Sequence, residues 1–236
     1  MNHNYHIREG IKQGIPVALG YIPIAITFGV LSKAANVTIG EAFLFSSMVY
    51  AGASQFMAIN MILLGSGFTQ IIIATFLLNL RHFLMSASLS QRIEVSNSRL
   101  LPFISFGVTD EAFSIASSRD GAVTSAFFMA LHLTIYFSWI IATVLGYLIG
   151  EILPPSLSSS MVVGLYAMFI AILIPQMKSS GRTCFLVLLS GLINTTIKTN
   201  NLLPKGWDIV TTISIVSLIG VILEGQVNRR EEKDEI

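Results

Sequence analysis

Long apolar runs separated by short polar stretches make up most of the 236-residue chain. Each run is close to the ~20 residues that an α-helix needs to cross a hydrocarbon layer of about 30 Å. Turn-forming residues end several runs, as at Gly65-Ser66-Gly67, Pro154-Pro155 and Leu203-Pro204-Lys205-Gly206. The pattern predicts an all-α, polytopic integral membrane protein with about seven hydrophobic helices, in a range of about six to eight. The expected segments are residues 14–32, 42–64, 69–89, 100–117, 122–149, 160–177, 183–197 and 207–224.

Two of these segments are poor membrane spans. The first contains Pro16 and Pro23, and a proline inside a helix removes a hydrogen bond and clashes with the preceding turn. In 100–117, Asp110 and Glu111 would cost about 5–7 kcal/mol if charged, against roughly 2.5–5 kcal/mol gained from the apolar residues. We expect both segments to be broken or re-entrant. We also expect 100–117 to be shielded from lipid by protein or by a water-filled cavity.

The basic residues predict an orientation. If the first and fourth segments do not cross fully, most positive charges fall on one side, which the positive-inside rule makes cytoplasmic. These charges are Arg8, Lys12, Lys33, Arg92, Arg99, Arg119, Lys178, Arg182, Arg229 and Arg230, with Lys198 and Lys205 as exceptions. Residues 1–12 then form a cytoplasmic N-terminus and 226–236 a charged cytoplasmic tail. We expect residues 1–236 to form a single transmembrane domain.

Composition excludes several classes of protein. Hydrophobic residues make up 53% of the chain and charged residues 11%, against roughly a quarter charged in a soluble domain. The net charge of +1 gives no basic stripe for nucleic acid. Cys184 is the single cysteine, so no disulfide or cysteine-based metal site can form within the chain. We expect neither a metal nor a cofactor.

The third segment carries a polar cluster of Asn79, Arg81 and His82. Arg81 would lie about 12 Å from the nearer end of the helix, at the limit of side-chain snorkelling. The insertion free energy gained from the apolar residues of this segment roughly offsets the cost of one central arginine, but not the cost of Asn79 and His82 as well. We therefore expect the cluster to face the protein. Arg81 either binds a ligand or pairs with Asp110 or Glu111 to hold helices together.

Asp110 and Glu111 are neighbours, so on a helix they point about 100° apart and cannot both serve one small site. A carboxyl group at low dielectric can exchange a proton near neutral pH, which suits proton coupling. The alternative is that Thr109-Asp110-Glu111 begins and caps a helix.

In the second segment, Tyr50, Gly52, Ser54 and Gln55 interrupt an apolar run. Small residues there permit either a local break, whose freed backbone groups bind a solute, or a tight packing seam. His132 in the fifth segment is interpreted as a packed, hydrogen-bonded residue.

Four motifs occur in order along the chain: GIPVALGYIPIAITFG at 14–29, VYAGASQFMA at 49–58, NLRH at 79–82 and TDEAF at 109–113. Together they resemble the AzlC family, the large subunits of branched-chain amino acid exporters. The resemblance implies a small hydrophobic AzlD-type partner, a multi-pass location in the bacterial inner membrane, and export of valine, leucine, isoleucine and methionine. Asn36 departs from the pattern, where a glycine would be expected.

The residues agree with such a function. Arg81 could meet the carboxylate of an amino acid, while Asp110 or Glu111 meets its ammonium group or, with His82, carries a coupling proton. Tyr50, Ser54, Gln55 and Asn79 could supply neutral hydrogen bonds. A proton-driven secondary exporter is the first hypothesis, and a channel for a small neutral or anionic solute is the alternative. An intramembrane hydrolase using His82 or His132 has little support, because no nucleophile elbow or HExxH motif is present, and we expect no enzyme.

Overall fold

The computed structural model describes residues 3–95, 97–119, 123–150, 170, 173–174, 177–178, 180–203 and 207–234. The chain forms two compact units, Met1–Ile59 with Asn79–Leu165 and Asn60–Leu78 with Tyr166–Ile236, and each is described by itself. Within these described residues, three helices are long and apolar enough to cross a membrane, which confirms the predicted all-α membrane class. The expected segment 160–177 lies almost wholly outside the described residues, as do Pro154-Pro155 and most of the 203–206 turn.

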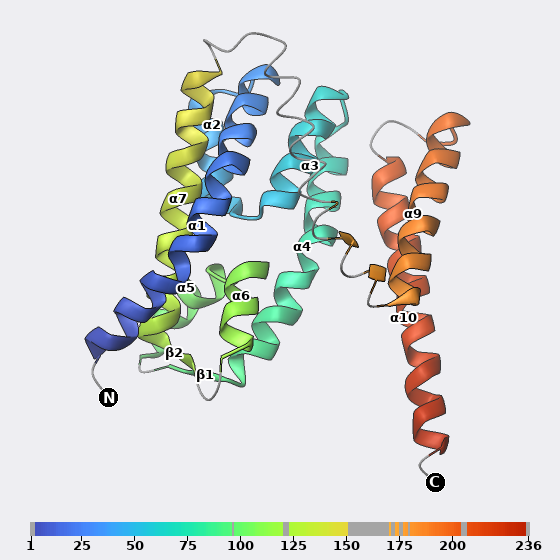
Figure 1. Ribbon diagram of the computed structural model, residues 1–236. Coiled ribbons are helices and arrows are strands. Elements are labelled where there is room, and N and C mark those ends of the chain that lie inside the picture. The colour runs from blue at the N-terminus through green and yellow to red at the C-terminus, as the bar shows by residue number, and fades with distance from the viewer. Residues whose placement is uncertain are drawn as a thin grey trace. The chain divides into compact units, whose positions relative to one another are not determined.

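Helices α1 (His3–Ala34) and α7 (Ser125–Ile149) lie side by side in the first unit (Figure 1). Glycines allow their backbones to touch, since a Cβ at Gly29 would stand 2.1 Å from the Thr143 carbonyl oxygen and one at Gly146 would stand 2.2 Å from that of Ile26. The predicted break in the first segment is wrong, because α1 continues through both prolines. Neighbouring helices can support a proline-containing span, and close contact along α7 does so here.

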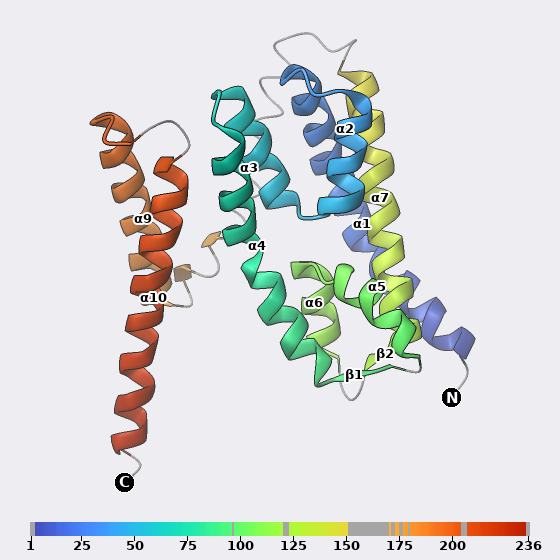
Figure 2. The ribbon, with the colours of Figure 1, turned by 180° about the vertical axis from the view of Figure 1, so that it is seen from behind.

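The second segment is a re-entrant hairpin instead of a single span. Its elements are α2 (Ile39–Leu44), a π-helix η1 (Phe45–Val49) and α3 (Gly52–Leu63). The Phe28 ring contacts both Phe45 and Phe56, at 6.3 and 5.5 Å between ring centroids. Residues eleven positions apart therefore meet one side chain, and the chain reverses between them at Tyr50 (Figure 2).

The predicted break in 100–117 is confirmed. After α4 (Phe68–Ser90), the chain forms β1 (Ile93–Glu94), η2 (Ser98–Leu100), α5 (Leu101–Phe106), α6 (Asp110–Ser117) and β2 (Val123–Thr124). Helices α5 and α6 rise only about 9 and 12 Å, too short to cross. Strands β1 and β2 pair in parallel, and Arg92 donates to the carbonyl oxygens of Ser117 and Arg119. These bonds close the base of a second re-entrant hairpin.

The second unit contains helices α9 (Gly181–Thr199) and α10 (Trp207–Asp234), which pack together. Their starts agree with the predicted segments to within about two residues, the usual boundary error. Helix α10 extends ten residues beyond its expected end at residue 224, into the charged tail 226–236. The cytoplasmic location of that tail and the single-domain organisation stay predictions.

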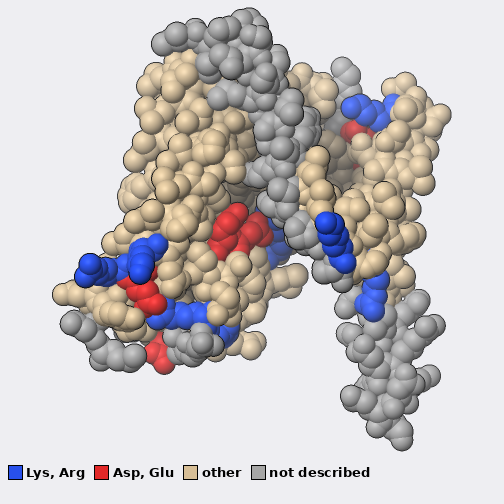
Figure 3. All heavy atoms as spheres, viewed as in Figure 1, with Lys and Arg blue, Asp and Glu red and all other residues tan. Residues whose placement is uncertain are grey.

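Charge is distributed unequally between the two ends of the first unit. Five basic residues lie at the end where β1 and β2 pair: Arg8, Lys12, Arg92, Arg99 and Arg119. Lys33 lies at the other end of α1, so the expectation that it shares a side with Arg8 is wrong. Figure 3 shows basic side chains gathered at the lower end of the first unit. The cytoplasmic location of this end, which the positive-inside rule would favour, stays a prediction.

Candidate functional site

The tips of the two hairpins meet against the middle of α7. Tyr50 turns the first tip with φ of 43°, a left-handed conformation uncommon for a bulky residue. Its ring stacks on Phe106 of the second hairpin at 5.7 Å and contacts Tyr136 of α7 at 4.9 Å. In the second tip, a Cβ at Gly107 would stand 2.4 Å from the His132 ring. Two half-spans from opposite ends therefore end at one place.

An ion pair lies beside this meeting point. Arg81 on α4 approaches Asp110 at the start of α6, with 2.9 Å between Nη2 and Oδ2. The two side chains remain 41% and 47% exposed, so the pair lies at the surface of the first unit instead of in its core. The pairing considered from the sequence is therefore present, and it leaves both side chains partly exposed.

The second tip is also the N-terminus of α6. Thr109 caps this helix, since its hydroxyl oxygen accepts from the Ala112 amide at 3.3 Å. Asp110 and Glu111 occupy the first turn, where the helix dipole favours negative charge. The capping interpretation of Thr109-Asp110-Glu111 is therefore confirmed, and it places both carboxylates at the tip.

The two neighbouring carboxylates point to different helices. Asp110 faces α4, whereas Glu111 accepts a hydrogen bond from the Tyr21 hydroxyl of α1. The Tyr21 ring packs edge-on against Trp139 at 5.1 Å. Tyr21 was missed from the sequence, where the only signal was a tyrosine between two prolines of an apolar run.

The neutral polar residues fall into two groups. Ser54 donates to Asn79 Oδ1 at 3.1 Å, which places this pair on α3 and α4 close to Arg81. Gln55 points elsewhere and donates to Ser46 Oγ, which contacts Thr143 Oγ1 at 2.8 Å. His82 lies half-buried on α4. Ser54 and Asn79 are thus bonded to each other, and no hydrogen bond among the described residues joins them to the Arg81–Asp110 pair.

Several buried polar atoms around the tips have no hydrogen-bond partner among the described residues. They are Tyr50 OH, Gln55 Oε1, Arg81 Nε, His132 Nδ1 and Trp139 Nε1. His132 is packed as expected, at 3% exposure, but its Nδ1 lacks the expected hydrogen bond. Because such orphan atoms are rare in native proteins, their concentration indicates a place that receives water or a polar ligand. Figure 3 shows acidic side chains at mid-height of the same unit.

Comparisons with known proteins agree on one family. Residues 16–153 match the family described as AzlC protein. An uncharacterized membrane protein of Archaeoglobus fulgidus is 36% identical over 174 residues, covering 72% of this chain and 76% of that one. The inner membrane protein YgaZ of Escherichia coli is 28% identical, covering 78% of each chain. The branched-chain amino acid transport protein AzlC of Bacillus subtilis is 24% identical, covering 61% of this chain and 58% of that protein. No solved structure matches.

Proposed function

Because this chain belongs to the AzlC family of membrane proteins, we propose that it is a secondary transporter that exports branched-chain amino acids. The proposed substrates are valine, leucine and isoleucine, a class that the name of the Bacillus subtilis relative supports, and methionine, which only the family resemblance implies. The observation that carries the proposal is the half-exposed Arg81–Asp110 pair at the meeting point of two re-entrant hairpins.

A zwitterionic amino acid matches this pair in charge and in geometry. In the empty site the two side chains neutralise each other, which lowers the cost of holding ions at membrane depth. The substrate carboxylate replaces Asp110 on the Arg81 guanidinium, and the substrate ammonium group takes Asp110 as its partner. Ser54 and Asn79, which are bonded to each other, are the proposed neutral hydrogen-bonding groups. The exchange keeps every charge paired as the solute enters and leaves.

Glu111 is the proposed carrier of the coupling proton. It is the neighbour of Asp110, the proposed partner of the substrate ammonium group, yet it faces α1, where Tyr21 donates to it. Substrate and proton therefore occupy separate carboxylates of one helix turn. His82, next to Arg81 on α4, is a second proton carrier in this scheme.

The transporter acts in a bacterial inner membrane together with a small AzlD-type subunit. The resemblance to the AzlC family implies this pairing. Purification from native membranes tests it: a hydrophobic protein of about half this length or less should copurify. If the chain purifies alone and transports alone, the two-subunit proposal is wrong while the substrate proposal stands.

Everted membrane vesicles test the substrate site, because export then appears as uptake of labelled leucine. Arg81→Gln should lower uptake by roughly 10- to 100-fold, since hydrogen bonds to charged groups contribute about 1.5–3 kcal/mol. Arg99→Gln is the matched control, because Arg99 is an exposed arginine at the end of the first unit. Normal uptake by Arg81→Gln, at equal protein in the membrane, would contradict the proposal.

A channel remains the second candidate, because half-spans that meet at mid-membrane also build pores. The same vesicles separate the two functions. Uphill accumulation of leucine that collapses when an uncoupler is added identifies a proton-driven transporter. A channel only equilibrates solute and never accumulates it.

A further inference from the structure

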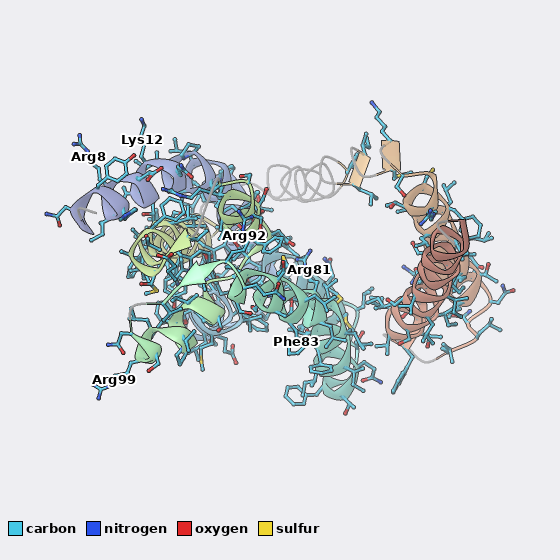
Figure 4. The ribbon with its side chains drawn as sticks, turned by 90° about the horizontal axis from the view of Figure 1, so that it is seen from below. Arg8, Lys12, Arg81, Phe83, Arg92 and Arg99 are labelled. Carbon is cyan, nitrogen blue, oxygen red and sulfur yellow. The ribbon has the colours of Figure 1, made fainter. Side chains whose placement is uncertain are left out.

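A groove of about 800 Å³ opens at the basic end of the first unit, between α1 and α6. Its walls include Tyr5, Arg8, Lys12 and Gln13 of α1 and Ile115 of α6. None of these residues takes part in the proposed transport site. Figure 4 shows Arg8 and Lys12 projecting from the same side of α1.

The groove carries uncompensated positive charge. The one carboxylate that lines it among the described residues, Glu9, is paired with Arg119 at 2.8 Å. The Arg119 guanidinium lies over the Phe127 ring at 4.3 Å from its centroid. Arg8 and Lys12 are exposed and form no ion pair within the described part of the chain. Two cations are therefore available to an anion that enters the groove.

The depth of these cations matches the headgroup layer of a membrane. The apolar part of α1 begins at Gly14, so Lys12 and Arg8 lie about 3 and 9 Å outside the hydrocarbon edge along the helix axis. Tyr5 is 60% exposed one turn further out, and tyrosines are enriched at membrane interfaces.

The same face of α1 continues into the hydrocarbon layer as an apolar surface. Ile11, Ile15 and Leu19 are 42%, 48% and 63% exposed. They follow Arg8 and Lys12 at spacings of three and four residues, which place all five side chains on one face. A phosphate bound by the two cations would thus have an apolar track beside it for acyl chains.

We propose that this groove binds an anionic phospholipid, with Arg8 and Lys12 on the headgroup phosphate and the acyl chains along Ile15 and Leu19. Basic pockets at the cytoplasmic ends of membrane helices bind such headgroups. Free inorganic phosphate shares the headgroup chemistry, but it would gain nothing from the apolar track.

Fluorescence quenching of the full chain in lipid vesicles tests the site. Tyr5→Trp introduces a reporter in the groove, and the parent chain provides the background from Trp139 and Trp207. In phosphatidylcholine vesicles, brominated phosphatidylglycerol should quench the reporter more strongly than brominated phosphatidylcholine does. Adding Arg8→Gln and Lys12→Gln should weaken this preference by roughly fivefold per residue, or about 25-fold together.

Two further variants serve as controls. Arg99→Gln removes an exposed arginine outside the groove and should keep the preference, as should the charge-preserving pair Arg8→Lys and Lys12→Arg. Equal quenching by both brominated lipids in the reporter chain would overturn the proposal, as would an equal loss in Arg99→Gln. Relief of quenching by millimolar inorganic phosphate would identify a free-anion site instead of a lipid site. Transport of leucine by the quenching-deficient variant would leave the proposed function intact.

Discussion

The two re-entrant hairpins enter the first unit from opposite ends and stop at the same helix, yet their tips carry different chemistry. The first tip is neutral and aromatic, and it turns through the left-handed Tyr50 after a π-helix. The second is ionic, and it turns into a capped helix whose first residues are Asp110 and Glu111. A capped helix N-terminus holds its charges in a fixed direction, whereas π-helical segments and left-handed bulky residues are sparsely populated and persist only through packing. In the proposed transporter the second hairpin therefore supplies the charged partners of the substrate, whereas the first supplies an aromatic and neutral surface.

Substitutions at the glycines of the two tips should show the largest difference. Gly107→Ala places a Cβ 2.4 Å from the buried His132 ring, whereas Gly52→Ala places one 3.0 Å from Trp139 Cη2. Overpacking costs about 1–3 kcal/mol, so Gly107→Ala should lower the melting temperature of the detergent-purified protein more than Gly52→Ala does. Gly40→Ala is the control, because a Cβ there meets nothing within 4 Å. Equal melting temperatures for Gly107→Ala and Gly40→Ala would mean that the tip does not pack on α7 as described.

How far the sequence predicts this fold depends on whether the deciding contacts are local. The ends of most segments were predicted within a few residues, because apolar length and glycine or proline signals are local. For the hairpin at 39–63 the sequence left a local break and a packing seam as alternatives, since the choice depends on contacts of its two halves with Phe28 and α7. Conversely, the prolines of α1 suggested a break that contact with Gly146, over a hundred positions away, prevents.

The residues of the candidate site likewise fall into those that the sequence could predict and those that depend on distant contacts. Arg81, Asp110 and Glu111 stood out because each charge is costly in a lipid environment, wherever its partner lies. The part played by Tyr21 could not be predicted, because its hydrogen bond to Glu111 joins residues 90 positions apart. The separation of Gln55 from Ser54 likewise depends on which way the first hairpin turns.

Separate substitutions of Asp110 and Glu111 test whether the two carboxylates of the second tip have different roles. Asp110→Asn removes the proposed ammonium partner and should raise the KM for leucine by roughly 10-fold or more, because a charged hydrogen bond is worth about 1.5–3 kcal/mol. Glu111→Gln should instead abolish uphill accumulation while vesicles still exchange internal for external leucine.

The measurement is labelled-leucine uptake in everted vesicles, with and without an imposed proton gradient, followed by counterflow exchange. Thr38→Ala is a useful control, since it removes the capping box with Glu41 at the far end of the first hairpin without touching either carboxylate. Identical kinetic defects in Asp110→Asn and Glu111→Gln would show that the two residues share one role, against the geometry that points them to different helices.

The smallest effect should come from removing single hydroxyl groups at the first tip, where two tyrosines in ring contact differ in their bonding. Tyr136 OH donates to the Ser47 carbonyl oxygen at 2.9 Å, whereas Tyr50 OH is buried without a partner among the described residues. Tyr136→Phe should therefore destabilise the protein by about 1 kcal/mol, and Tyr50→Phe should leave the melting temperature unchanged or raise it. If Tyr50 OH instead completes its bonding through the substrate, Tyr50→Phe should raise the KM for leucine a few-fold while stability is preserved. A stability loss in Tyr50→Phe as large as that in Tyr136→Phe would mean that its hydroxyl is already satisfied within the protein, and the first tip would then contribute only shape to the site.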